Sequence, residues 1–374
     1  MSRVSATNEP APFLHADHVG SLLRPLELRQ AFRDFNAGSL DLEEFRKVQD
    51  RCIEGVVKAQ EAIGLRAVTD GEFRRQSYWS HFVDAVEGLD VAPARFEFRD
   101  DTGETTHFLS PHVTGKVSRA QPISGEEFSY LRRIATAVPK VTLPSPPTMH
   151  FWAQTGTVQA AGYTDDDAYL ADLARVYAEE LAELAEHGAT YVQLDEVPLA
   201  MLCDGELRDR LEASGEKPDR TVQRYVDLMN ACLAGRPQGL RIGLHLCRGN
   251  FKGRWLSDGG YEYVARKLFN EIEVDTFFLE YDTARAGGFE PLGAVPDMRS
   301  VVLGLVSTKV PVLEAKKALT RRIEEASAYV PLERLGLSPQ CGFASTVGGN
   351  AVTEDDQWRK LELVVETARE VWGS

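Results

Sequence analysis

Short apolar runs rich in β-branched residues alternate along the chain with longer stretches of helical periodicity. This alternation is typical of βαβ units arranged around a parallel sheet. Eight such runs predict strands at residues 13–21, 66–70, 140–145, 190–195, 240–247, 275–280, 301–307 and 334–340. Eight strands with helices between them predict an α/β domain over residues 13–374, folded as a (β/α)8 TIM barrel.

The helical period is clearest between residues 166 and 187, where large apolar side chains recur every three or four positions. Asp165 and Gly188 flank this stretch with residue types that begin and end helices. The same pattern predicts further helices at residues 261–272, 313–329 and 354–372.

Two segments do not follow the alternation. Residues from about 89 to 130 alternate as in a β-hairpin, which predicts an insertion between the second helix and the third strand. Residues 1–12 predict a disordered N-terminal segment, because they are mostly polar and precede the first strand.

Composition narrows the range of partners. The 374 residues are 43% hydrophobic and carry a net charge of −15, which suits a large core and argues against nucleic-acid binding. No segment resembles a signal peptide or a membrane span, so no membrane partner is expected. Five widely spaced cysteines do not form a disulfide pattern, which predicts a reduced, cytoplasmic protein. The sequence is compatible with a homo-oligomer but does not determine the oligomeric state.

Residues able to take part in chemistry stand at or just after the ends of most predicted strands. TIM-barrel active sites are built at this carboxyl face, so residues remote in sequence are expected to meet in one pocket. Any one acidic residue here could instead be a solvated loop residue. The set comprises Asp17, His18, Ser21, Asp70, Glu72, Asp195, Glu196, His245, Cys247, Glu280, Lys309 and Cys341.

His245 and Cys247 form a His-x-Cys pair at the end of the fifth predicted strand. Their side chains project to the same face, and Zn²⁺ binds nitrogen and sulfur ligands tetrahedrally. The pair alone is a weak signal, since free cysteines are commonly small buried hydrophobic residues. Glu280 and Cys341, near the ends of two other strands, complete a predicted quartet of zinc ligands. A structural zinc site is the alternative, although four Cys or His ligands are commoner there.

Six short motifs follow one another along the chain. They are HADHVGSLLRP from residue 15, VTDGEFR from 68, YVQLDE from 191, HLC from 245, FFLE from 277 and LSPQCGFA from 337. As an ordered set they resemble the catalytic domain of cobalamin-independent methionine synthase, most closely its short single-barrel bacterial forms. The resemblance extends from about residue 15 to the C-terminus.

The resemblance implies a zinc-dependent methyltransferase of methionine biosynthesis. In this family the zinc ligands fall on His245, Cys247, Glu280 and Cys341, and the metal holds the acceptor thiol as a thiolate. The thiolate of homocysteine takes a methyl group from methyltetrahydrofolate. Glu280 is then suited to be the labile ligand, because exchanging a carboxylate for a thiolate leaves the charge of the site unchanged.

The resemblance also implies a binding site for homocysteine. Asp195 aligns with an aspartate that binds the amino group, while Gly20 and Ser21 align with the groups that bind the carboxylate. An aspartate at a strand end can form a charge-assisted hydrogen bond with ammonium, or it can cap the next helix. The second carboxylate of the family falls near Ser80, which predicts that half of the ammonium site is missing.

Three more residues are assigned to the pocket by the same alignment. Glu72 and Glu196 are placed in its wall. Trp152 ends the loop at residues 144–152, where the family contacts folate, and its ring could stack on a pterin or simply belong to the core.

The family's general-acid histidine falls at or near Lys309. An acid is needed because the amine that leaves the methyl donor must be protonated. Lys309 could be this acid, bind an anionic group or form a salt bridge. His18, His81 and His150 are other candidates, although each could equally be structural.

The leading hypothesis is therefore methyl transfer from a methyltetrahydrofolate-like donor to zinc-activated homocysteine. The alternative enzyme is a zinc-dependent thiol alkyltransferase with another acceptor or donor, such as a coenzyme M-type epoxide transferase or one that uses a methylated corrinoid protein. Ser80 and Lys309 favour this alternative. A non-catalytic zinc-binding protein is the third class.

Overall fold

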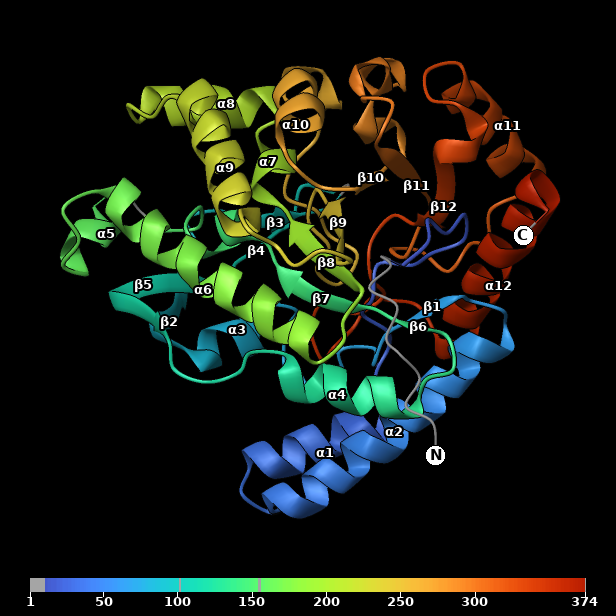
Figure 1. Cartoon of the computed structure of the whole chain (residues 1–374), viewed down its shortest axis with the longest axis horizontal. Helices are drawn as coiled ribbons and strands as arrows, with labels where there is room; N and C mark the ends of the chain where they lie inside the picture. Colours follow the sequence, from blue (N-terminus) through green and yellow to red (C-terminus); the bar gives the residue numbers. More distant parts are fainter. Residues whose placement is uncertain (1–10, 101, 154–155, 374) are drawn as a thin grey trace.

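A computed structural model describes residues 11–100, 102–153 and 156–373 of the chain. Parallel strands lie at its centre and helices surround them, as Figure 1 shows. The largest sheet has the strand order β7 to β12 without exception, so each strand pairs with its neighbour in sequence. Its strands are β7 (Val141–Pro144), β8 (Tyr191–Glu196), β9 (Arg241–Leu246), β10 (Thr276–Glu280), β11 (Ser300–Val306) and β12 (Leu335–Pro339).

The remaining barrel positions are joined by shorter contacts. Strand β1 (Ala67–Val68) pairs in parallel with β6 (Val138–Pro139), which leads directly into β7. The first predicted strand forms only a parallel bridge between Ala16 and Leu337, so its regular ladder was predicted too long. On its other side, the Leu22 N–H donates to the Gly71 carbonyl at 3.1 Å. These contacts connect the first and second positions to the sheet.

The main helices cover the outside of the strands and correspond closely to the predicted pattern. Asp165 caps α6 by accepting a hydrogen bond from the Ala168 N–H, and a helix over residues 354–372 is confirmed. The stretch at 261–272 divides into a 3₁₀ turn and α10, and the helix predicted from 313 begins at Lys316. The helices are α1 (Leu26–Asn36), α2 (Leu42–Ala62), α4 (Gly125–Ile134), α6 (Asp166–Glu186), α7 (Pro198–Met201), α8 (Gly205–Ala213), α9 (Pro218–Leu233), α10 (Ala265–Glu271), α11 (Lys316–Ser327) and α12 (Glu354–Trp372).

Within the described part of the chain, five 3₁₀ turns connect these elements. They are η1 (Pro146–Met149), η2 (Tyr261–Tyr263), η3 (Ala284–Ala286), η4 (Glu290–Ala294) and η5 (Leu332–Arg334).

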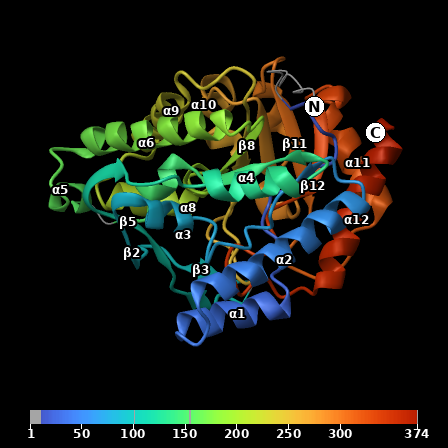
Figure 2. The ribbon, with the colours of Figure 1, turned by 60° about the horizontal axis from the view of Figure 1, so that its bottom comes forward.

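The predicted insertion is an antiparallel hairpin before the third barrel strand. Strand β2 (Val86–Pro93) pairs with β5 (Leu109–Arg119), and the connection contains the small pair β3 (Phe98–Arg99) and β4 (Thr105–Thr106). Its bounds differ from those predicted: it starts at Val86, and helix α4 begins at Gly125. Helix α3 (Ser80–Ala85) precedes it and α5 (Thr157–Ala160) lies nearby, as Figures 1 and 2 show.

The N-terminal prediction is tested only in part, because residues 1–10 lie outside the described residues. Ala11 is buried, and its carbonyl accepts a hydrogen bond from Arg241 Nε at 2.7 Å. Ala11, which belongs to the segment predicted to be disordered, therefore packs against the barrel. All five cysteines belong to the described part of the chain and are free thiols. Across the described residues, no helix combines the length and apolar character needed to cross a membrane.

Arg24 ties together three loops at the carboxyl face of the barrel. Its fully buried guanidinium donates to the carbonyls of Ala344 at 2.6 Å, Glu72 at 2.8 Å and Arg75 at 3.1 Å. Burial lowers the pKa of Arg24 to about 10, so the side chain stays charged at neutral pH. The loops after the first, second and eighth strand positions are thereby held in one arrangement.

We expect Arg24→Met to lower the free energy of unfolding by about 3 kcal/mol, because each buried acceptor left unpaired costs about 1–3 kcal/mol. Urea denaturation monitored by circular dichroism measures the change. The control is Arg33→Met on the exposed face of α1, which should change stability by less than about 0.5 kcal/mol. Equal stabilities for the two variants would contradict the role of Arg24.

Candidate metal centre and active site

Three of the four predicted zinc ligands meet at the carboxyl face of the barrel. Ligand atoms of His245, Cys247 and Cys341 all lie within 4.8 Å of one another, and the three residues are buried. His245 is on β9, Cys247 follows this strand, and Cys341 lies just after β12. Neither ring nitrogen of His245 has a partner that meets the geometric criteria of a hydrogen bond among the described residues, although Cys341 lies close enough to raise the pKa of the His245 ring.

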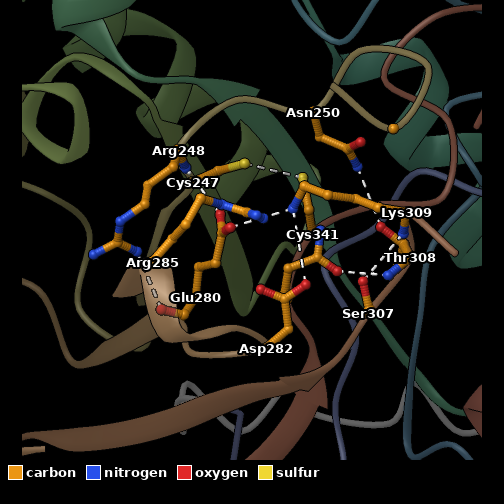
Figure 3. Close-up of polar contacts among 12 residues, drawn as sticks. Cys247, Arg248, Asn250, Glu280, Asp282, Arg285, Ser307, Thr308, Lys309 and Cys341 are labelled. Carbon is orange, nitrogen blue, oxygen red and sulfur yellow. Dashed lines mark hydrogen bonds and ion pairs between the residues drawn. The ribbon is translucent and has the colours of Figure 1, made fainter. Parts of the chain in front are cut away.

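The two sulfur atoms of this cluster lie within hydrogen-bond distance of each other. Cys247 Sγ donates to Cys341 Sγ at 3.3 Å, as Figure 3 shows. This hydrogen bond lowers the pKa of the Cys341 thiol well below its usual value, against the opposing effect of burial. Because thiolates, rather than thiols, bind metals, Cys341 is prepared for coordination. The donor set fits Zn²⁺, which in catalytic sites has three protein ligands and an exchangeable fourth position.

Glu280 lies beside this cluster but is bound by other groups. Its Oε1 atom accepts from Lys309 Nζ at 3.2 Å, and its Oε2 atom accepts from the Arg248 N–H at 2.9 Å. Burial disfavours the charged carboxylate, yet Lys309 and Arg248 together lower the pKa of Glu280. The structure therefore does not bring Glu280 into the ligand cluster with the other three residues.

Lys309 is a buried ammonium rather than a surface lysine. Burial disfavours its charge, but Glu280 and Asp282 outweigh this effect and raise its pKa. Asp282 Oδ2 is 4.0 Å from the Nζ atom. A lysine with a raised pKa holds its proton firmly at neutral pH, which makes it a poor general acid. Lys309 thus forms an ion pair with Glu280, which is one of the roles considered for it.

A cavity of about 690 Å³ leads to the cluster from outside. Its inner end is polar and its outer end is mainly apolar. Nine of the predicted site residues line it: Ser21, Glu72, Ser80, Trp152, Asp195, Glu196, His245, Cys247 and Cys341. Among the described residues that line it there is no Lys or Arg.

Two adjacent carboxyl groups at the end of β8 have pKa values close to neutral. Burial raises the pKa of Asp195 to about 7 and that of Glu196 to about 7. Glu196 Oε1 accepts from the Leu199 N–H at 2.6 Å, and Asp195 Oδ1 accepts from Gln193 Nε2 at 2.7 Å. Each of these groups can therefore gain or lose a proton near pH 7.

Glu72 is a buried carboxyl group close enough to Asp195 to contribute to the raised pKa of Asp195. Glu72 is fully buried and has a positive φ of 61°, which is rare for residues other than glycine. Its Oε1 atom accepts from the Thr142 hydroxyl at 2.8 Å. Its Oε2 atom has no partner among the described residues. The Ser80 hydroxyl instead donates to the Ser77 carbonyl at 3.1 Å.

Gly20 and Ser21 are placed by close packing at the inner end. Gly20 has a φ of 135°, and an added Cβ would lie 2.6 Å from Thr142 Cγ2. A Cβ on Gly342 would lie only 1.9 Å from Ser21 Oγ, so the glycine after Cys341 lets these two loops touch. Ser21 lines the cavity, whereas Gly20 supports it from behind.

The outer end of the cavity is formed largely by the hairpin insertion. Phe98 and Phe108 pack edge to face with ring centroids 4.8 Å apart, and Phe108 packs in the same way on Trp152 at 5.4 Å. Phe251, from the loop after β9, contacts Phe98. Trp152 is buried in this cluster and also lines the cavity, so it belongs to both the core and the pocket.

Three histidines considered as general acids lie elsewhere. Burial lowers the pKa of His18 to about 3 and the pKa of His81 well below its usual value, so both rings are neutral at pH 7. His150 Nδ1 lies 2.9 Å from the Tyr225 hydroxyl, on the helical side of the barrel. None of the three lines the cavity. Their part in proton transfer stays a prediction.

Sequence reasoning missed several cavity residues. Tyr78 and Trp79 line the pocket but lie within a stretch that was considered only for Ser80. Phe98 and Phe108 could have been found from the alternation of the hairpin, whose inward positions carry aromatic rings. Asn250, which follows the His-x-Cys motif by three positions, had no distinguishing signal.

The geometry agrees with comparisons against known proteins. Residues 14–369 match the family model described as cobalamin-independent synthase, catalytic domain. The chain belongs to the cobalamin-independent methionine synthase family. The protein YxjG of Bacillus subtilis is 40% identical over 371 residues, which cover 96% of this chain and 95% of that protein. A methionine synthase of Pyrococcus abyssi is 26% identical over 334 residues, with 89% and 87% coverage.

Solved structures confirm the fold. A Listeria monocytogenes protein with the provisional name vitamin-B12-independent methionine synthase superimposes with a TM-score of 0.74 at 30% identity, covering 98% of this chain and 100% of that one. A structure from Shewanella also has a TM-score of 0.74, at 20% identity and 96% and 98% coverage. The TIM-barrel prediction and the family resemblance are both confirmed, and membership identifies the chain as a methyltransferase of the methionine synthase type.

The raised pKa of Glu196 predicts a pH-dependent stability. The unfolded chain ionises this group near 4.5 and the folded chain near 7, so its stabilising contribution is complete below about pH 4.5 and falls as the pH rises towards 7. Between pH 4 and 8, Glu196→Gln should gain up to about 3 kcal/mol relative to the unsubstituted protein, since one pKa unit is about 1.4 kcal/mol.

Urea denaturation at several pH values tests this prediction. Glu54→Gln, at an exposed position of α2, is the control and should give a stability difference that does not depend on pH. Parallel pH profiles for Glu196→Gln and the unsubstituted protein would show that the Glu196 carboxyl has an ordinary pKa.

Proposed function

We propose that this chain is a zinc-dependent S-methyltransferase that converts homocysteine to methionine with a methyltetrahydrofolate-like donor. The observation that carries the proposal is the His245, Cys247 and Cys341 cluster at the inner end of a cavity that also contains carboxylates. Family membership supports the methyl transfer itself. The cofactor and both substrates are the proposed part.

The three clustered side chains would hold the zinc ion. When bound, zinc would supply the positive charge that keeps the acceptor sulfur as a thiolate at neutral pH. A free thiol has a pKa near 8.5 and is mostly protonated under these conditions. Lys309 contributes a further buried positive charge close to Glu280 and the two cysteines.

The amino acid end of homocysteine is expected to bind beside the metal. The carboxylates of Glu72 and Asp195 can each accept a hydrogen bond from the ammonium group. The Oε2 atom of Glu72 has no other hydrogen-bond partner among the described residues. The Ser21 hydroxyl lines the same end and can donate to the substrate carboxylate. The related Shewanella structure contains selenomethionine, an analogue of the proposed product.

The methyl donor is expected to occupy the outer end of the cavity. Trp79, Phe98, Phe108 and Trp152 give it an aromatic wall on which a flat ring can stack. The methyl group moves to the thiolate, and the electron pair of the broken C–N bond remains on the leaving nitrogen, which takes up a proton. Glu196 lines the cavity with a pKa of about 7 and is better placed to provide this proton than Lys309.

A thiol alkyltransferase with a different donor or acceptor is the second candidate. The supporting observation is the cavity lining, which contains no Lys or Arg among its described residues. It therefore offers no Lys or Arg to bind the polyglutamate tail that a folate donor can carry. Mass spectrometry of S-alkylated products discriminates the two, with several thiols screened against methyltetrahydrofolate, methylcobalamin and small alkyl donors. Methionine formed from homocysteine and methyltetrahydrofolate would exclude this second candidate.

Substitution of either clustered cysteine should remove the metal. We expect the purified protein to contain about one zinc ion, and Cys247→Ser and Cys341→Ser to lose both the zinc and the methyl transfer, because each removes a thiolate ligand. Inductively coupled plasma mass spectrometry measures the metal. Cys52→Ser, in α2, is the matched control and should keep its zinc. Stoichiometric zinc in both cluster variants would disprove the site.

Loss of either carboxylate should weaken binding of homocysteine. Glu72→Gln and Asp195→Asn should each raise the KM for homocysteine roughly tenfold to hundredfold, because a hydrogen bond to a charged group contributes about 1.5–3 kcal/mol. Steady-state kinetics with varied homocysteine measures this change. Asp90→Asn, on the exposed hairpin, provides the control. An unchanged KM in both variants would show that the ammonium group binds elsewhere. Tight zinc binding by the unsubstituted protein without any turnover would indicate a non-catalytic zinc protein.

A further inference from the structure

A lysine and a glutamine that are buried behind the cavity wall form a hydrogen bond with each other. Lys140 directly precedes β7, and Gln193 lies within β8, two residues before Asp195. Lys140 Nζ donates to Gln193 Oε1 at 3.2 Å, and the two residues are 1% and 0% exposed. Neither residue belongs to the cavity wall, so an effect on a substrate must act through other groups.

Lys140 uses all three of its ammonium N–H bonds inside the barrel. Besides Gln193, it donates to Asp17 Oδ1 at 2.7 Å and to the His18 carbonyl. Asp17 Oδ2 accepts in turn from the Tyr191 hydroxyl at 2.7 Å. The side chains of Lys140 and Asp17 are 0% and 1% exposed, so each charge is compensated mainly by the other. The ammonium group is therefore held in one position.

Lys140 also determines which way the side-chain amide of Gln193 points. An ammonium group has donors only, so the amide must turn its oxygen towards Lys140 and its NH2 group away from it. The two N–H bonds of this group then donate to the Val19 carbonyl at 2.5 Å and to Asp195 Oδ1 at 2.7 Å. A reversed amide would place its oxygen against two acceptors. Gln193 thus connects the Asp195 carboxyl group to the backbone at Val19.

These hydrogen bonds reach both parts of the proposed binding site for the amino acid end of the acceptor. Asp195 is a proposed partner of the ammonium group, and Ser21 is the proposed partner of the carboxylate. Lys140 and Gln193 together hold the chain at residues 17–19, which end two positions before Ser21. One connected set of buried side chains therefore supports both contacts.

We propose that Lys140 and Gln193 are positioning residues that set the distance between the ammonium contact at Asp195 and the carboxylate contact at Ser21. They thereby favour an acceptor thiol that carries both groups of an α-amino acid. This inference rests on the proposed function and deepens it, because it names the feature that selects the acceptor. Binding groups work well only when they are held in the correct geometry, whereas a thiol with a single charged group does not depend on this distance.

The experiment compares the binding of two thiols to the purified protein by isothermal titration calorimetry, without a methyl donor. One thiol is homocysteine, and the other is 4-mercaptobutanoate, which is homocysteine without its amino group. Gln193→Met has a similar shape but cannot donate to Asp195 or Val19, so we expect it to bind homocysteine about tenfold more weakly or worse. Its affinity for 4-mercaptobutanoate should change by less than about threefold.

A second variant removes the lysine without leaving a buried charge unpaired. Asp17→Asn combined with Lys140→Met makes both partners neutral, which is better tolerated than the loss of one partner. The Gln193 amide is then free to reverse, so homocysteine should again bind about tenfold more weakly or worse. Glu314→Gln combined with Lys360→Met is the matched control. It neutralises another pair with a buried lysine, at 3.0 Å and outside the cavity wall, and should bind both thiols as the unsubstituted protein does.

Homocysteine binding within about threefold of the unsubstituted protein, in both Gln193→Met and the variant that combines Asp17→Asn with Lys140→Met, would overturn the inference. Equal losses of affinity for the two thiols would overturn it as well, because they would indicate a general disturbance of the cavity. Failure of the proposed function gives a different result: a protein that binds homocysteine in this pattern but forms no methionine leaves the inference standing. A chain that binds no homocysteine at all disproves both.

Discussion

The in-register pairing of parallel strands is the constraint on which the rest of the structure depends. Asp195 on β8 pairs directly with His245 on β9, and His245 pairs with Phe278 on β10, two residues before Glu280. Because the strands run in parallel, their chemically active ends reach the same face of the barrel. A shift of one residue would turn His245 away from the cavity. Backbone hydrogen bonds thus determine which side chains can meet a substrate.

Burial then gives the assembled groups their chemical character. Asp195 and Glu196 have pKa values of about 7 because water is excluded from them, whereas Glu280 keeps its charge through Lys309 and Arg248. Two kinds of carboxyl group therefore coexist within one face of the barrel. Carboxyl groups with a pKa near 7 can exchange protons at neutral pH, and Glu280, which is paired with Lys309, provides a fixed negative charge.

Much of this could be predicted from sequence, and the missing parts have physical reasons. Strand ends and an ordered set of motifs located His245, Cys247 and Cys341, because periodicity and residue type are local properties. The pairing of Glu280 with Lys309 was not predictable, since it depends on how the loops after β10 and β11 approach each other. The positive φ of Glu72 could not be predicted either, because residues other than glycine rarely adopt this conformation.

Two parts of the chain, the hairpin insertion and the strand ends of the barrel, form different walls of the cavity. Phe98 and Phe108 of the hairpin insertion form the aromatic outer wall together with Trp79 and Trp152, while strand ends of the barrel carry the candidate metal ligands and the inner carboxylates. Mutations in the hairpin can therefore change the outer wall without altering His245, Cys247 or Cys341. The outer half of the pocket can therefore be redesigned while the candidate metal ligands are kept.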